Sequence, residues 1–96
     1  MFREGQRSAD RLFTIIFRAN GLGEARLGFA ISRQKIRRAV GRNRLRRLVR
    51  ASLRSLQTEL PGFDIVVIAK DAAAVAGNPE IFASLDRHWP RLRQSQ

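Results

Sequence analysis

The chain has 96 residues, a formal net charge of +11 and no cysteine. This length predicts one domain spanning residues 1–96, and the lack of cysteine excludes disulfides and thiolate metal sites. No apolar run approaches the roughly 20 residues that a membrane-spanning helix needs, and the N-terminal residues lack the apolar stretch of a secretory signal, so we expect a cytoplasmic protein.

The first third of the chain predicts two strands. The first ten residues are mostly polar and suit a loop or a short edge strand. Aromatic and β-branched residues then favour a strand over Arg11–Ala19, and turn residues separate it from an alternating strand over Arg26–Ser32. The side chains expected to face the core are Phe13, Ile15, Phe17, Leu27, Phe29 and Ile31. We predict that the two strands pair as a hairpin, and that small residues leave the other face of the second strand open and shallow.

A long basic helix is expected after a basic connection from Ser32 to Gly41. Between about Arg42 and Leu60 the apolar residues recur at the i, i+3, i+4, i+7 spacing of a helix with one buried stripe. Pro61 and Gly62 would end it. The predicted buried stripe consists of Leu45, Leu48, Val49, Ser52, Leu56 and Leu60. At about 100° per residue, the opposite side holds Asn43, Arg46, Arg47, Arg50 and Arg54.

The last third predicts a buried strand and a second helix. Phe63–Lys70 is a nearly continuous apolar run, typical of a strand covered on both faces. An alanine-rich loop over 71–77 follows. Asn78–Glu80 then combines a capping residue, a proline and an acid, which is a strong helix start. Pro90 should end or kink this helix, and residues 91–96 should fray.

The predicted order of elements is therefore β-β-α-β-α. A strand, a long helix and another strand form a βαβ unit, so the second and third strands are expected to be parallel. The predicted class is α+β: a small mixed sheet of three to four strands with two helices packed on one side.

Catalysis by this chain alone is poorly supported. Its single histidine, His88, lies beside Trp89, where a surface or packing role is the commoner one. The eight carboxylates are scattered, without a pair spaced for acid/base chemistry or for holding a metal. No phosphate-binding glycine motif occurs. The sequence thus predicts no catalytic residue and no metal site.

The basic segment from Arg33 to Arg54 is the strongest functional signal. It holds nine arginines and one lysine, and no acid occurs between Glu24 and Glu59. A merely solvated helix face usually mixes charges, whereas here like charges stand four residues apart. These are Arg42, Arg46, Arg50 and Arg54. Their mutual repulsion favours a polyanion partner, and such binding should weaken steeply with salt.

The nature of that polyanion can be narrowed. The sequence has no helix-turn-helix pair, zinc site or leucine zipper, so the common DNA-reading modules are absent. A face crowded with arginine suits recognition of shape and backbone, as in structured RNA. The open sheet face, where Ile16 and Arg18 are expected, could hold a single strand if it carried stacking groups. The phenylalanines of the strands fit core packing better.

Three segments together resemble the protein subunit of bacterial ribonuclease P: RLGFAIS, AVGRNRLRRLVRASLR and PGFDIVVIAK. The core of that family's signature is an Arg-Asn-Arg triplet after an Ala-Val pair, followed by more basic residues on the same helix. Here the pair is Ala39-Val40 and the triplet begins at Arg42. The resemblance extends from Phe2 to about Leu92, with order and spacing in agreement.

The resemblance implies a role in tRNA processing. The family's holoenzyme removes the 5′ leader of precursor tRNA by hydrolysing one phosphodiester bond. Catalysis there belongs to an RNA subunit, with Mg²⁺ bound largely by that RNA. The implied partners are therefore the catalytic RNA and precursor tRNA, without a membrane, a small-molecule substrate or a cofactor bound directly by the protein. The resemblance also implies a left-handed βαβ crossover.

Two groups of site residues follow from the basic segment and the motif match. The predicted RNA-binding residues are Arg33, Lys35, Arg37, Arg38, Arg42, Asn43, Arg44, Arg46, Arg47, Arg50 and Arg54. The family holds the single-stranded leader in a cleft at the sheet's open face. The matching residues are Phe2, Ile16, Arg18, Ala30 and Ser32. The chain starts near the end of the family's N-terminal helix, so we expect that helix to be missing.

Two other functions share parts of this pattern. A ribosomal or other structured-RNA-binding protein without a processing role would have the same basic composition and a similar small fold. A self-sufficient nuclease would cleave RNA without any RNA subunit. Cleavage assays with each component alone and together would separate the three.

Overall fold

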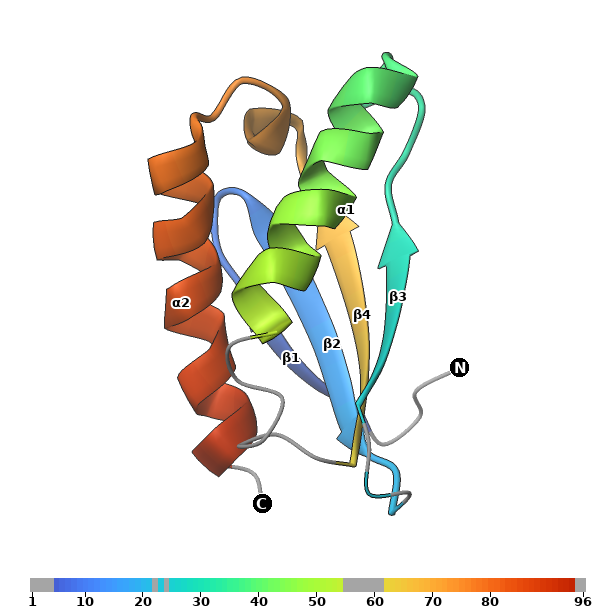
Figure 1. The fold of residues 1–96 in the computed structure, drawn as a ribbon, viewed down its shortest axis with the longest axis vertical. Helices are drawn as coiled ribbons and strands as arrows, with labels where there is room; N and C mark the ends of the chain where they lie inside the picture. The colour runs from blue at the N-terminus through green and yellow to red at the C-terminus, as the bar shows by residue number, and fades with distance from the viewer. Residues whose placement is uncertain (1–4, 22, 24, 55–61, 95–96) are drawn as a thin grey trace.

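The computed structural model describes residues 5–21, 23, 25–54 and 62–94, which form a four-stranded sheet with two helices on one face (Figure 1). The elements in chain order are β1 (Gln6–Ala9), β2 (Phe13–Ala19), β3 (Arg26–Ala30), α1 (Ala39–Arg54), β4 (Phe63–Ala69), the short 3₁₀ helix η1 (Asp71–Ala74) and α2 (Asn78–Gln94). The predicted α+β class is confirmed. The first residues add an edge strand, so the order is β-β-β-α-β-α.

The strands are arranged in the order β1-β2-β4-β3. β2 is antiparallel to both β1 and β4, while β3 is parallel to β4. The predicted parallel pair is confirmed, but the predicted hairpin between β2 and β3 is wrong because β4 lies between them. β4 carries the most continuous apolar run of the sheet, and a central position buries it best.

The connection from β3 through α1 to β4 is left-handed. In Figure 1 both strands point upward, α1 lies in front of them, and β4 lies to the left of β3. Nearly all such connections in proteins have the opposite hand. The handedness that the resemblance implied is therefore present in this chain.

The core lies between the sheet and the two helices. Its largest fully buried side chains are Trp89, Phe13, Phe17, Phe63, Leu12, Ile15, Leu45, Ile65, Ile81, Leu85 and Leu92. The Nε1–H of Trp89 donates a hydrogen bond to Oγ of Ser52 at 2.8 Å, which joins α2 to α1 inside the core. Leu27 and Phe29 are only partly buried because β3 is an edge strand.

Both helices differ from their predicted bounds. α1 begins at Ala39, three residues before the expected start, and Leu53 joins its buried stripe. The predicted stripe residues Leu56 and Leu60 lie outside the described residues. α2 does not end at Pro90 and continues to Gln94, so the expected frayed tail is wrong for its described part. Full burial of Leu92 beyond the proline outweighs the one backbone hydrogen bond that proline cannot make.

Candidate nucleic-acid interface

The arginines of α1 divide into an outward set and a set held by the protein itself. Arg47, Arg50 and Arg54 are exposed, as is Asn43. Arg42, Arg44 and Arg46 are half-buried, and each donates hydrogen bonds to a neutral acceptor within the chain. The helix therefore presents exposed guanidinium groups beside others that are held by internal hydrogen bonds.

Arg42 fixes the turn that leads into α1. Its Nη1 donates to the backbone carbonyls of Ile36 and Arg37, each at 2.9 Å. Ile36 is buried, and its N–H donates to the carbonyl of Ser32 at 2.9 Å. Arg42 thus holds the turn on which the exposed Arg37 and Arg38 are carried.

Arg44 joins α1 to the start of α2. Its Nε and Nη2 donate to Oδ1 of Asn78 at 3.1 and 2.6 Å, and Nη2 also donates to the carbonyl of Ala76 at 2.9 Å. The partners are more than 30 residues away, so no local pattern could indicate this contact. An arginine that the sequence assigned to RNA alone also has a structural role.

Arg46 is oriented by Asn43 on the same helix, and Arg50 by Phe29 on β3. Nη1 of Arg46 donates to Oδ1 of Asn43 at 2.9 Å, one turn earlier. Cζ of Arg50 lies 5.2 Å from the centroid of the Phe29 ring, a cation–π distance. Neither contact neutralises the positive charge.

The described part of the chain places no carboxylate within ion-pair distance of any α1 arginine. Its ion pairs instead involve Asp10, Asp64 and Glu80, with partners on β2, β3, α2 and the β1–β2 turn. The connection before α1 adds exposed basic side chains with no hydrogen bond or ion pair to the described residues. These are Arg33, Lys35, Arg37 and Arg38. Connection and helix together carry ten basic side chains without an acidic partner among the described residues.

The sheet face away from the helices contains most of the predicted leader-cleft residues. The strand register places Ile16 beside Arg7 and Val66, and it places Ala30 beside Ile68. Ile16, Arg18 and Ala30 share this open face, as the alternation predicted. Ser32 lies just beyond β3, where its Oγ accepts a hydrogen bond from the N–H of Gln34. Phe2 lies outside the described residues.

One end of the open face is organised around Asp64. Arg26 donates Nε and Nη2 to its two carboxylate oxygens, both at 2.8 Å, and Asn20 donates Nδ2 at 2.9 Å. Arg18 lies 3.6 Å away. The hydrogen bond from Arg26, with that from Asn20, holds the pKa of Asp64 well below its usual range. Two guanidinium groups facing one carboxylate leave this end cationic.

A buried polar cluster joins β1 to α2. A hydrogen bond of 2.6 Å connects Oγ of Ser8 with Nδ1 of His88, and Nε2 of His88 lies 3.3 Å from Oδ2 of Asp10. The same carboxylate accepts hydrogen bonds from the N–H groups of Leu12 and Phe13 and from Oγ of Ser84. The sequence missed this cluster because Ser8 and His88 are 80 residues apart.

The cluster contains serine, histidine and aspartate but cannot act as a hydrolase triad. Ser8 is fully buried and His88 is 2% exposed, so neither can reach a substrate. The packing role expected for His88 is confirmed. Burial lowers its pKa against the opposing effect of Asp10. Burial alone would raise the pKa of Asp10, but its hydrogen bonds from Ser84, Phe13 and Leu12 lower it further than burial raises it.

Within the described ranges, no three acidic or histidine side chains are grouped so that they could hold a metal ion. No described helix combines the length and the apolar character needed to cross a membrane.

Known proteins are similar to this chain in both sequence and fold. A family whose description is Ribonuclease P matches residues 1–93. The ribonuclease P protein component of Vibrio vulnificus (strain YJ016) is 46% identical over 92 residues, which cover 96% of this chain and 78% of that protein. This chain belongs to the ribonuclease P protein family. The protein component of Methylococcus capsulatus is 42% identical over 89 residues, covering 93% of this chain and 70% of the relative.

Solved structures of ribonuclease P proteins agree with this assignment. The Staphylococcus aureus protein matches with a TM-score of 0.84 at 27% identity, covering 93% of this chain and 82% of that one. The Thermotoga maritima protein matches with a TM-score of 0.75 at 28% identity, covering 97% and 86%. The chain is thus a protein component of the ribonuclease P endoribonuclease, which implies tRNA 5′ maturation and association with the ribonuclease P RNA.

Proposed function

We propose that this ribonuclease P protein binds the catalytic RNA through α1 and the connection before it, and binds the 5′ leader of precursor tRNA through the open sheet face. Both contacts would promote endonucleolytic removal of the leader. The separation of charge carries this proposal: six arginines of α1 have no carboxylate partner among the described residues, while Asp10, Asp64 and Glu80 pair elsewhere.

The α1 surface suits phosphate groups rather than base edges. Arginine forks bind phosphate oxygens bidentately, and several such contacts release counterions, which makes binding salt-dependent. Arg42 and Arg46 are held in place by internal hydrogen bonds, so part of this surface is ordered before RNA arrives. Exposed Arg47 and Arg54 can adapt to the RNA backbone.

The hydrolytic step is assigned to the RNA subunit, with its Mg²⁺ ions. Membership of the family implies this assignment, and the described residues fit it: Asp10, Asp64 and Glu80 bond to arginines, a serine or backbone N–H groups, and the histidine is buried. The protein would act by binding and positioning two RNA molecules.

The open face offers a shallow path for a single strand. A hollow of about 250 Å³ lies along β3 and β4, where Gly28 has no side chain. Arg26 lies at its border and Arg18 at the same end of the sheet. The described residues of this face include no aromatic side chain, so leader binding would depend on phosphate contacts more than on base stacking.

Cleavage of precursor tRNA at limiting Mg²⁺ tests the proposal, using RNA subunit alone, protein alone and both together. We expect the protein to raise the RNA-catalysed rate and to cleave nothing by itself. RNA binding without stimulation would favour a structured-RNA-binding protein without a processing role. Cleavage by protein alone would favour a self-sufficient nuclease.

The leader contact is tested separately with Gly28→Val. A Cβ at Gly28 would lie 3.9 Å from the nearest Val66 side-chain atom, so the strand can accept the substitution while the hollow is filled. The holoenzyme should then distinguish less between precursor tRNA and mature tRNA in binding, with RNA-subunit affinity unchanged. Ala9→Val, on the edge strand of the same face, is the matched control. Equal discrimination by both variants would contradict leader binding at this hollow.

A further inference from the structure

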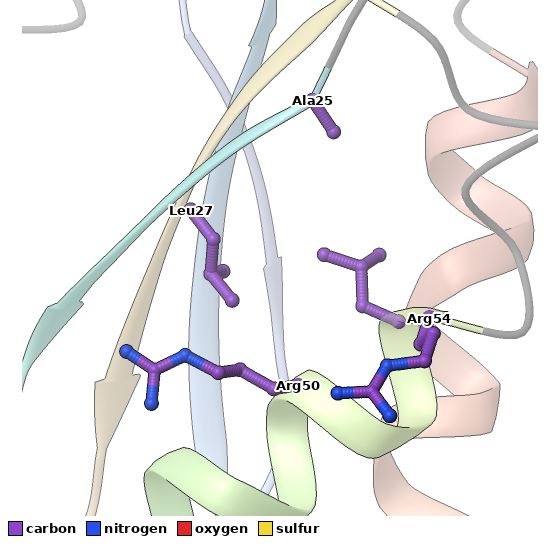
Figure 2. A pocket seen from close by; sticks show the side chains of 5 residues that line it. Ala25, Leu27, Arg50 and Arg54 are labelled. Carbon is purple, nitrogen blue, oxygen red and sulfur yellow. The ribbon is translucent and has the colours of Figure 1, made fainter.

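A pocket of about 210 Å³ lies between the last turns of α1 and the start of β3. It is lined by Ala25, Leu27, Arg50, Leu53 and Arg54. In Figure 2 the two arginines approach it from the helix, and Ala25 and Leu27 approach it from the strand. The pocket is on the helix-covered side of the sheet, so it is separate from the open face assigned to the leader.

The lining combines two kinds of surface. Ala25, Leu27 and Leu53 form apolar walls, and Leu53 is itself part of the core. Arg50 and Arg54 are one helical turn apart, so their guanidinium groups can approach a single anion from neighbouring positions. Among the described residues that line the pocket, none is a carboxylate that would repel an anion. A ligand that fits both surfaces has a flat, weakly polar part and a negative charge.

The size of the pocket and the placement of Arg50 narrow the ligand further. Drug-sized ligands usually occupy about 300–1,000 Å³, so this volume suits one small ring system. The guanidinium of Arg50 stacks on the Phe29 ring, with Cζ 5.2 Å from the centroid. Guanidinium planes also stack on nucleobases. Phe29 thus helps to hold the Arg50 guanidinium at the border of the pocket, where a nucleotide would meet it.

We propose that this pocket binds one unpaired nucleotide of an RNA partner. The base would lie against Ala25, Leu27 and Leu53, and its phosphate between Arg50 and Arg54. The inference rests on the proposed function, because it assumes that α1 faces RNA. It adds a specific contact to a surface that otherwise recognises backbone charge. The nucleotide can come from the catalytic RNA or from precursor tRNA, which carry the same chemistry.

Nucleotide binding is tested first on the protein alone, by NMR. The full chain is titrated with AMP, CMP, GMP and UMP, and separately with inorganic phosphate at equal ionic strength. Nucleotides should shift the methyl signals of Leu27 and Leu53 together with the Nε signals of Arg50 and Arg54, whereas phosphate should shift the arginine signals only. Methyl shifts that are equal with phosphate, or absent with every nucleotide, would overturn the proposal.

A pocket-filling variant tests the contact in the complex. Ala25→Leu occupies the space without changing charge, and Ala83→Leu, an exposed position on α2, is the matched control. The affinity of Ala25→Leu for RNA should fall about tenfold, which corresponds to about 1.4 kcal/mol, without a change in salt slope. Two affinities of this variant are measured: that of the protein for the RNA subunit, and that of the holoenzyme for precursor tRNA. The affinity that falls identifies the RNA that supplies the nucleotide.

A second substitution guards against misfolding. Arg54→Lys keeps the charge but removes the planar fork, and thermal melts of both variants establish that the fold is retained. If Ala25→Leu and Arg54→Lys bind both RNAs as tightly as Ala83→Leu, the pocket proposal is wrong even though the wild type stimulates cleavage. If the wild type itself gives no stimulation, the proposed function is wrong, and the nucleotide titration still decides the pocket separately.

Discussion

Arginine has opposite roles in two regions of this molecule. On α1 the arginines contact backbone carbonyls, an asparagine amide or an aromatic ring, all of which leave the charge unmatched. On the strands, the β1–β2 turn and the face of α2 near Asp10, arginines pair with Asp64, Asp10 and Glu80. The comparison shows that an acid neutralises the arginine in one region, whereas on α1 the charge stays unmatched even where the side chain, as at Arg42 and Arg44, also stabilises the fold.

The difference also explains how so basic a chain can fold. Asp10 and Glu80 form ion pairs where the β1–β2 turn meets α2, and Asp64 pairs with Arg26 and Arg18 on the open sheet face, so much of the positive charge in these regions is neutralised. The excess charge is concentrated on one helix and its leading connection, outside the core. Repulsion there is reduced by solvent and salt, and is relieved further when a polyanion binds.

The largest effect is expected from removing the acid that organises the paired region. Asp10→Ala deprives two backbone N–H groups and Ser84 of their acceptor, and should lower the free energy of unfolding by about 3 kcal/mol. Urea denaturation measures this change in the free energy of unfolding. The salt slope of RNA binding should not change in the folded variant, and a changed slope would show that the two regions are not separate.

The next largest effect is expected from removing α1 arginines that have no acidic partner among the described residues. Arg47→Ala combined with Arg54→Ala should weaken RNA-subunit affinity about tenfold or more near physiological salt and reduce the log–log salt slope by about 1–2. The free energy of unfolding should change by less than about 0.5 kcal/mol. Arg11→Ala with Arg87→Ala removes the same charge from the paired region. If this control reduces the salt slope by the same amount, RNA binding depends only on the net charge of the protein.

Arg44 provides a smaller and more local test, because it belongs to the basic helix but bonds within the protein. Arg44→Ala and Asn78→Ala should each lower stability by about 1 kcal/mol, with a coupling of about 0.5 kcal/mol or more in a double-mutant cycle. Arg47→Ala, which has no such partner among the described residues, is the control. Additive effects of the Arg44 and Asn78 substitutions would mean that the contact stabilises nothing.

The smallest effect is a dependence of stability on pH. Burial lowers the pKa of His88 from an ordinary value near 6.5, so the unfolded chain binds a proton more readily than the folded one. Stability should be constant above pH 7.5 and fall as the pH drops below about 6.5. His88 is the only histidine, so His88→Gln should remove this slope between pH 5 and 7. An unchanged slope would assign the effect to another group.

The sequence predicted what depends on local periodicity. The buried stripe of α1, the inward faces of β2 and β3 and the outward arginines all follow from spacing along the chain. Sheet order does not, because it depends on which strands pair across long separations in the chain. A hairpin between β2 and β3 was therefore predicted where β4 intervenes.

The parts of the site that the sequence missed are contacts between distant residues. Ser8 meets His88, and Arg44 meets Asn78, only after the sheet and both helices have packed. The motif correctly located the basic helix but could not separate arginines that bond internally from those that do not. The pocket beside Arg50 was likewise invisible, since its walls come from two elements on either side of a long connection.

Trp89 gives this protein a built-in optical reporter. It is the only tryptophan, its ring is fully buried, and its indole N–H bonds to Ser52 on the inner side of α1. Its fluorescence should therefore have a blue-shifted emission and resist quenching by acrylamide in the native state. Loss of α1 docking would expose it, whereas RNA added to the outer surface of the docked helix would leave it shielded. One unlabelled signal can thus separate damage to the fold from damage to binding in every variant described above.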